Sequence, residues 1–207
     1  MTTYNLSTPL SEKDVTKLEL GDLVYFSGYA FTCRSRLQKY CFDEGNNLPF
    51  SIDDMNLLIH VGPVIRKKDE EWDLISFMPT SSIRFEKWGP ESIEEWGLKA
   101  IVGKTTMGEK TAQAMKRNNC VHCTVQSVSP NLWVDSIEIV DVHLRDQLGS
   151  IEAPWLFKLD KLGPFFVDMD SKGNNYFDEL DKKIEKNRKK VYKNLNISEN
   201  FEYTKLY

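Results

Sequence analysis

The chain has 207 residues, 41% of them hydrophobic, which is enough for one folded domain with a hydrophobic core. Its net charge of −4 argues against a nucleic-acid-binding surface as the main function. No apolar run approaches the roughly 18 residues that a membrane-spanning helix needs, and the first residues resemble neither a secretory leader nor an Arg-rich transit peptide. We therefore expect a soluble, cytoplasmic protein that binds neither nucleic acid nor membrane.

The first part of the chain predicts short strands separated by Gly and Pro turns. Residues 5–20 predict a first strand and a turn, and an apolar run follows Gly21-Asp22 as a second strand. Arg34 precedes a segment with helical character that extends to about residue 43. The run 57–65 predicts a buried strand ended by Gly-Pro. His60 lies inside that run, which favours a core or rim histidine over a catalytic one.

Three consecutive hydroxyl residues, Thr80 to Ser82, follow a predicted strand at 72–77 and precede a helical pattern at 85–96. Pro79 ends the strand because it lacks the amide that a ladder needs. The hydroxyls offer N-cap oxygens beside exposed amides, and Arg84 adds a fork-shaped cation. Such a place suits a carboxylate or a phosphate. The alternative is a capped helix with an ordinary surface arginine.

A second candidate for an anion site follows the predicted strand 98–102. Gly103-Lys104-Thr105 comes next, and a helix is predicted from about residue 109 to 117. Strand, loop and helix in this order form anion sites in α/β folds. The P-loop pattern GxxxxGK is absent because Leu98 stands five residues before Gly103, so we exclude nucleoside triphosphate binding. Lys104 is then either a ligand-binding cation or a surface lysine.

The second half of the chain predicts four more strands and then a change in composition. The strands are expected at about 121–127, 137–142, 155–159 and 165–170. Residues 178–207 hold eight Lys or Arg against six acidic residues, without Gly or Pro. We expect an appended charged helix with a tail. A nucleic-acid-binding arm is the alternative, which the acidic residues make less favourable.

The four cysteines are Cys33, Cys41, Cys120 and Cys123. An intracellular chain of this size is not expected to use them as a disulfide framework. Cys120 and Cys123 form a lone CxxC around His122. Two interpretations stay open: small buried residues at a strand end, or a metal site completed by His122 and a distant ligand.

Seven motifs occur in the order and spacing of a known family. They are Gly21-Asp22 with its strand, Ser27-Gly28, Thr32-Cys33-Arg34, residues 60–64, residues 79–84, residues 102–108, and residues 165–170 with Gly173-Asn174. On these motifs residues 5–177 resemble the β subunit of the iron–sulfur hydro-lyases, class I fumarate hydratase and L(+)-tartrate dehydratase. The same unit forms the C-terminal domain of single-chain class I fumarases.

The resemblance implies an α/β fold, a swivelling β/β/α domain with layered sheets and helices on one face. It implies a hydro-lyase β-subunit-like domain at 1–177 and an appended charged helix and tail at 178–207. It also implies a larger α subunit, in an α2β2-type heteromer, that carries a [4Fe–4S] cluster on its own cysteines. The cysteines of this chain are then not cluster ligands, and this chain holds no metal.

The implied activity is reversible dehydration of a 2-hydroxy dicarboxylate, with malate to fumarate as first choice and tartrate to oxaloacetate as second. Loss of the C3 proton builds negative charge onto a carboxylate, so cations are needed there. By resemblance Arg34 and Arg84 are carboxylate clamps. Thr80 matches the proton-abstracting hydroxyl, Ser81 lies beside it, and Lys104 faces the same site. Thr80, Arg84 and Lys104 are thus the predicted catalytic residues. These three, together with Arg34 and Ser81, are predicted to bind substrate.

The chain also departs from the family pattern at several positions. Ser35 and Gln38 stand where the family has an acidic residue and a histidine, and Thr105-Thr106 replaces Gly-Gly. Residues 124–129 replace a Gly-rich segment. These departures bear on substrate choice. They support an alternative function, in which a diverged, non-catalytic relative keeps the anion pocket as a binding or scaffold module.

Overall fold

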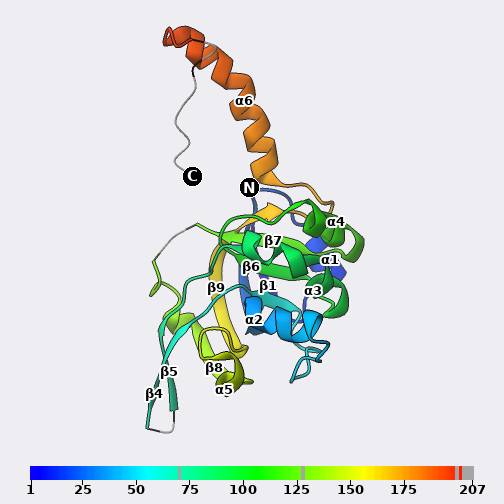
Figure 1. Cartoon of the computed structure of the whole chain (residues 1–207), viewed down its shortest axis with the longest axis vertical. Coiled ribbons are helices and arrows are strands. Elements are labelled where there is room, and N and C mark those ends of the chain that lie inside the picture. Colours follow the sequence, from blue (N-terminus) through cyan, green and yellow to red (C-terminus); the bar gives the residue numbers. More distant parts are fainter. Residues whose placement is uncertain (70, 127–128, 199–200, 202–207) are drawn as a thin grey trace. The chain divides into compact units, whose positions relative to one another are not determined.

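A computed structural model describes residues 1–69, 71–126, 129–198 and 201 (Figure 1). The chain divides into two compact units, Met1–Asn175 and a second that begins at Tyr176. The strands of the first unit are β1 (Thr3–Ser7), β2 (Leu23–Thr32), β3 (Leu57–Ile59), β4 (Val64–Lys68), β5 (Glu71–Ser76), β6 (Ala100–Gly103), β7 (Val121–Val125), β8 (Ile137–Val142) and β9 (Trp155–Met169). Its helices are α1 (Glu12–Thr16), α2 (Ser35–Gln38), the π-helix η1 (Lys39–Asp43), the 3-10 helix η2 (Ser82–Trp88), α3 (Gly89–Glu95), α4 (Glu109–Asn118), the 3-10 helix η3 (Val134–Ser136) and α5 (Arg145–Leu148).

The main sheet closes on itself. Strands β1, β2, β3, β6 and β7 run parallel, and β9 lies antiparallel to its neighbours. Because β9 pairs with both β7 and β2, the strands β2, β3, β6, β7 and β9 form a closed, barrel-like ring, with β1 and β8 at its sides. The predicted mixed α/β class is confirmed.

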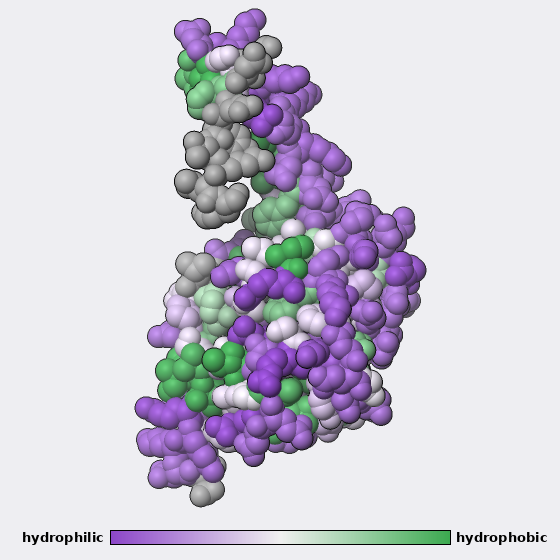
Figure 2. Space-filling model, viewed as in Figure 1, coloured by the Kyte–Doolittle hydropathy of each residue, from purple (hydrophilic) through white to green (hydrophobic). Residues whose placement is uncertain are grey.

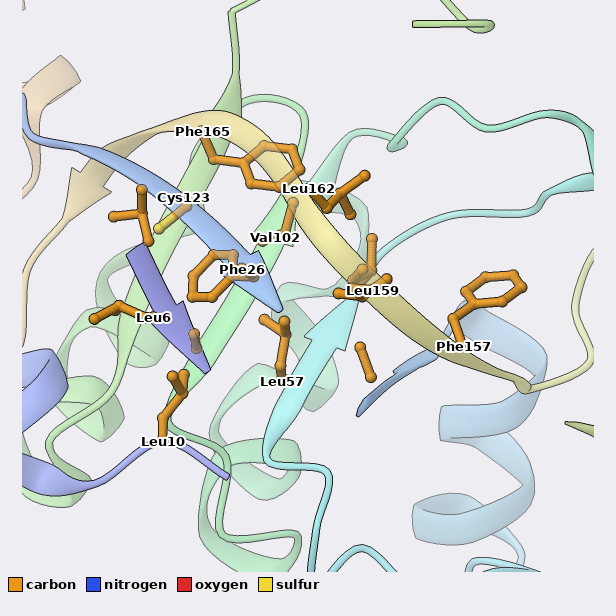
Figure 3. Close-up of a cluster of buried hydrophobic side chains, with 14 of the residues drawn as sticks. Leu6, Leu10, Phe26, Leu57, Val102, Cys123, Phe157, Leu159, Leu162 and Phe165 are labelled. Carbon is orange, nitrogen blue, oxygen red and sulfur yellow. The ribbon is translucent and has the colours of Figure 1, made fainter. Parts of the chain in front are cut away.

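Alternate residues of the ring strands face two different cores, as the period of two in a strand requires. One set points into the ring, where Figure 3 shows the labelled side chains of Leu6, Phe26, Leu57, Val102, Cys123, Leu162 and Phe165. The other set includes Phe31, Leu58 and Ile101, which join a second cluster with residues of α2, α3 and α4. Strands buried on both faces are therefore nearly continuous apolar runs.

The single strand β9 runs from Trp155 to Met169, so the prediction of two strands, at 155–159 and 165–170, is wrong. In β9, Gly163 and Pro164 lie opposite Tyr25 alone, between the pairs Phe26–Leu162 and Val24–Phe165. This extra residue is a β-bulge, one of the few places where a strand accepts proline. The strand therefore continues through a sequence that reads as a turn.

A separate two-stranded sheet, β4–β5, projects from the ring (Figure 1). The face of the first unit that is seen in Figure 1 and Figure 2 is mostly hydrophilic, with a hydrophobic area beside the projecting strands. The exposed large hydrophobic residues of the unit include Val64, Ile75 and Val140 on β4, β5 and β8. For the strand predicted at 121–127, which is β7 in the structure, the predicted end at Ser127 lies outside the described residues.

The second unit contains the predicted charged helix, α6 (Tyr176–Asn194). Its apolar residues Leu180, Ile184 and Val191 are exposed. None of the described helices is long and apolar enough to cross a membrane. The predicted tail falls largely on residues 199–200 and 202–207, outside the described part. The predicted domain boundary after residue 177 stays a prediction.

Candidate active site

Three polar residues follow the carboxyl ends of parallel strands. Two of them, Arg34 and Lys104, are predicted site residues, and the third is His60. Arg34 lies two residues beyond β2, His60 follows β3 directly, and Lys104 follows β6 directly. The strands β2, β3 and β6 are neighbours in that order. Since ligands of parallel sheets bind at the carboxyl ends of the strands, this edge is the natural place for a site.

The loop around Thr80 is inserted between the extensions of β3 and β6. The amide of Thr80 donates to the His60 carbonyl at 2.7 Å, and the amide of Lys104 donates to the Thr80 carbonyl at 2.9 Å. The amide of Ser82 donates back to the Lys104 carbonyl at 2.9 Å, and Ser81 forms a parallel bridge with Lys104. These bonds hold Thr80, Ser81 and Lys104 side by side.

Arg84 joins this group through its side chain. Its Nη2 donates a hydrogen bond to Thr80 Oγ1, and its guanidinium lies 5.9 Å from the centre of the Phe85 ring. A guanidinium has no acceptor, so Thr80 Oγ1 accepts this bond and keeps its own proton for another direction. An exposed cation therefore contacts the hydroxyl predicted to move a proton.

The predicted cations differ in their partners. Within the described part of the chain, no carboxylate pairs with Arg84 or Lys104. Arg34 has a partner, because its Nε lies 3.1 Å from Oε1 of Glu152, with both side chains about four-fifths buried. The structure thus brings together Thr80, Ser81, Arg84 and Lys104, while Arg34 holds a carboxylate of its own chain.

Arg34 is also placed by a close backbone approach. A Cβ on Gly62 would lie 2.6 Å from Arg34 Nη1 and 2.8 Å from the backbone oxygen of Ile151, so a side chain at residue 62 would displace the guanidinium or the backbone beside it. Beside it, the Oγ of Ser35 lies 3.3 Å from Glu152 Oε2, and the amide of Arg36 donates to the same oxygen at 2.9 Å. Gln38 is buried and donates from Nε2 to Ser92 Oγ at 3.1 Å, away from these groups.

The helix N-termini do not contribute to the site as the sequence suggests. The segment after Ser81 is a 3-10 helix that begins at Ser82, and the Ser81 side chain does not cap it. The N-terminus of α4 is occupied by Glu86, which accepts bonds from the Gly108 amide at 2.7 Å and the Thr111 amide at 3.1 Å. A carboxylate there is favourable to the helix, so this place is not open to an anionic ligand.

Sequence analysis missed a buried polar cluster beneath the loop. Ser82 Oγ lies 2.9 Å from His60 Nδ1 and 2.9 Å from His122 Nε2. His122 Nδ1 lies 2.6 Å from Asp168 Oδ1. The prediction that His60 is a core histidine is confirmed, since it is 1% exposed. Burial lowers the pKa of His60 well below its ordinary value, with a further contribution from His122, so His60 is uncharged at neutral pH.

The cysteines do not fit a metal or cluster. All four are buried, and burial raises the pKa of Cys41 to about 11 and that of Cys120 to about 12. Burial also raises the pKa of Cys33 and Cys123 well above the ordinary value. Thiolates are the ligating form, and no group of three or more His, Cys, Asp or Glu among the described residues could hold a metal ion. The interpretation of the CxxC as buried small residues is confirmed.

Comparisons with known proteins identify the family. A family model described as Fumarase C-terminus matches residues 1–180. The chain is 28% identical over 200 residues to the L(+)-tartrate dehydratase subunit beta of Escherichia coli (strain K12), covering 97% of this chain and 98% of that protein. It is 32% identical over 179 residues to a putative L(+)-tartrate dehydratase subunit beta of Methanocaldococcus jannaschii, covering 84% and 91%. It is 30% identical over 178 residues to a putative class I fumarate hydratase of Geobacillus stearothermophilus, covering 86% of this chain and 34% of that protein.

The family match covers the whole first unit and extends into α6. The resemblance drawn from the seven sequence motifs is therefore confirmed. The chain belongs to the fumarase C-terminus family of hydro-lyases.

Proposed function

We propose that the chain is the β subunit of a [4Fe–4S]-dependent hydro-lyase, an enzyme that reversibly dehydrates a 2-hydroxy dicarboxylate. Membership of the family and the names of the relatives support the hydro-lyase activity. The observation that carries the assignment of roles is the contact of Arg84 with the Thr80 hydroxyl, beside the backbone of Lys104. This chain supplies the groups that bind carboxylate and transfer the proton.

The roles follow from the chemistry of the side chains. Thr80 Oγ1 removes the proton from C3 as an alkoxide, after its own hydroxyl proton has passed to solvent, because the neutral hydroxyl is too weak a base for this task. The donor from Arg84 stabilises the alkoxide form of that oxygen through a charge-assisted hydrogen bond. Arg84 and Lys104 also stabilise the negative charge that develops on the substrate carboxylate. Ser81, beside Lys104, offers a further hydroxyl donor to the same carboxylate.

Arg34 is the proposed clamp for the second carboxylate. Its guanidinium fork suits a carboxylate geometrically, and the contact with Glu152 is an ion pair through Nε alone, without hydrogen-bond geometry. To bind substrate, Arg34 shares its donors between Glu152 and the ligand or exchanges one for the other. Arg84 does not have this requirement, because no carboxylate among the described residues pairs with it.

The cluster belongs, in this proposal, to a larger α subunit in an α2β2-type heteromer. When bound there, the cluster supplies Lewis-acid chemistry for the leaving hydroxyl. The relatives that match over nearly their whole length are named as β subunits, which supports a partner chain. The swivelling, layered arrangement of the family fold and a cytoplasmic location complete the proposal.

Malate and fumarate are the first proposed substrate pair, and tartrate and oxaloacetate are the second. The separate β subunits among the relatives carry the tartrate dehydratase name, whereas the fumarate hydratase relative is a longer protein. Both pairs therefore belong in the same assay.

The test is anaerobic reconstitution of the full chain with its α subunit. We expect no dehydratase activity from the chain alone and turnover of malate or tartrate by the complex. Activity of the purified single chain would contradict the division of the site between two subunits. A complex with an intact cluster and no activity on either substrate would favour the non-catalytic, anion-binding or scaffold function.

A further inference from the structure

The buried cluster beneath the loop is a continuous chain of hydrogen-bonding side chains from three strands and the loop itself. Asp168 belongs to β9, His122 to β7, His60 follows β3, and Ser82 begins η2. All four are 1% exposed or less. Buried polar groups are costly unless they are hydrogen-bonded. Because Asp168 Oδ2 is buried without a hydrogen-bond partner among the described residues, this cluster costs some stability.

The Ser82 hydroxyl is the central link of the chain. It lies 2.9 Å from a nitrogen of His60 and 2.9 Å from a nitrogen of His122. A hydroxyl has one proton, so it donates to at most one of the two imidazoles. Both contacts are hydrogen bonds when the other imidazole nitrogen carries a proton and donates to Ser82 Oγ. Asp168, 2.6 Å from His122 Nδ1, accepts from that nitrogen and so sets the orientation of the His122 ring.

This arrangement is not a hydrolase triad, although serine, histidine and aspartate occur together in one. Ser82 is fully buried. A Cβ on Gly103 would lie 1.7 Å from Ser82 Oγ and 3.2 Å from His122 Nε2. The backbone of Gly103 therefore closes the space in front of the hydroxyl, and no substrate carbonyl reaches it.

The buried hydrogen-bonded cluster instead holds the loop that carries the candidate site. The loop is anchored at two residues. The amide of Thr80 donates to the carbonyl of His60, and Ser82, two residues later, is held by the buried cluster. The Ser82 amide binds the carbonyl of Lys104 at 2.9 Å. Ser82 is thus fixed both by its side chain and by its backbone. Thr80 is half-buried and Arg84 is exposed.

We propose that Ser82, His122 and Asp168, with His60, are positioning residues that hold the segment 80–84 in register with Lys104. The inference rests on the proposed function for its effect on activity. Without the Ser82 hydroxyl, two buried imidazole nitrogens lose their partner. The loop then shifts to find other partners, and a displacement of about 1 Å at a reacting group can cost on the order of 100-fold in rate.

The first test measures amide hydrogen exchange in the full chain, which does not depend on catalysis. The reporters are the amides of Thr80, Ser82 and Lys104. In Ser82→Ala and Asp168→Asn we expect exchange at these amides to be about tenfold faster, while the amides of β8 keep their wild-type rates. Unchanged exchange at all three amides in both variants would overturn the inference.

A matched control is available on the surface. His143 Nε2 lies 3.3 Å from Asp141 Oδ2, a contact of the same type between a half-buried histidine and an exposed aspartate. Asp141→Asn makes the same chemical change as Asp168→Asn, and we expect wild-type exchange at the three reporter amides. Equal acceleration in both variants would mean that the effect is not specific to the buried chain.

The second test measures the reconstituted complex. For Ser82→Ala we expect kcat to fall about 100-fold and KM to change less than threefold, with a larger isotope effect for substrate deuterated at C3. Asp168→Asn keeps the shape and one acceptor, so it covers the case in which Ser82→Ala does not fold, and its expected loss of kcat is about tenfold. Wild-type kcat in a folded Ser82→Ala complex would overturn the inference. An inactive wild-type complex would contradict the proposed function instead, and the exchange measurement would still decide this inference.

Discussion

Two arginines at the same edge of the sheet differ in a way that their sequence contexts do not show. Arg34 lies beside Glu152, which neutralises it, whereas Arg84 contacts a hydroxyl and has no carboxylate partner within the described residues. Both were expected to clamp a substrate carboxylate. In the proposed site, Arg84 and Lys104 would meet the substrate anion directly, whereas Arg34 would first share or exchange its partner.

The same contrast extends to the helix next to Lys104. The N-terminus of α4 is a favourable place for an anion, but the carboxylate of Glu86 already occupies it. Carboxylates of the chain itself therefore fill two of the places that attract anions along this edge. What they leave open is the group formed by Thr80, Arg84 and Lys104.

The largest expected effect comes from removing the hydroxyl at the centre of that group. Thr80→Val keeps the shape but not the oxygen, and we expect kcat of the reconstituted complex to fall about 10²- to 10⁴-fold, the range for a general acid or base. Thr80→Ser is the matched control and should keep most of the activity. A Thr80→Val complex with more than a tenth of wild-type kcat would exclude Thr80 as the base.

Arg84→Gln should have the next largest effect, and it breaks the comparison with Arg34 most directly. Loss of a charged donor costs about 1.5–3 kcal/mol, which corresponds to roughly 10- to 150-fold in kcat/KM. Arg84→Lys keeps the charge without the fork and should recover part of the loss. Steady-state kinetics of Arg84→Gln and Arg34→Gln give the test. An equal or larger loss for Arg34→Gln would mean that the neutralised arginine is the main clamp.

The sequence predicts one half of this comparison and not the other. Thr80, Ser81 and Arg84 lie in one short motif, and the family resemblance adds Lys104, which directly follows a strand. The ion pair of Arg34 depends on Glu152, whose bond to neighbouring Ser35 spans 117 positions in the chain. No local pattern encodes such a contact.

The structure shows what surrounds two of the positions that depart from the family pattern. Ser35 stands where the family has an acidic residue, yet Glu152 brings a carboxylate to the same place. Gln38 stands where the family has a histidine, and its side chain is buried against Ser92. The first departure is compensated across the fold, whereas the second removes a titratable group. Sequence comparison at single positions cannot distinguish these outcomes, because it does not contain the contact.

Glu152→Gln sharpens the comparison by freeing Arg34. We expect KM for the dicarboxylate to fall about two- to fivefold, because the guanidinium no longer exchanges a charged partner for the substrate. We also expect the free energy of unfolding to fall by about 1–3 kcal/mol, because the largely buried Arg34 loses its charged partner. Kinetics and thermal unfolding measure the two effects. A rise in KM would show that Glu152 orients Arg34 for binding rather than competing with the substrate.

Glu86→Gln tests the filled helix N-terminus and should have the smallest effect on activity. The carboxylate accepts bonds from the amides of Gly108 and Thr111 and from the Thr111 hydroxyl, and a glutamine offers only one acceptor oxygen in its place. We expect the free energy of unfolding to fall by about 1 kcal/mol, with KM unchanged, because the cap lies outside the substrate site. Glu109→Gln is the matched control, since Glu109 is an exposed acid in the first turn of the same helix. An equal loss of stability in the control would assign the effect to helix electrostatics alone. A change in KM for Glu86→Gln would mean that the N-terminus of α4 takes part in binding after all.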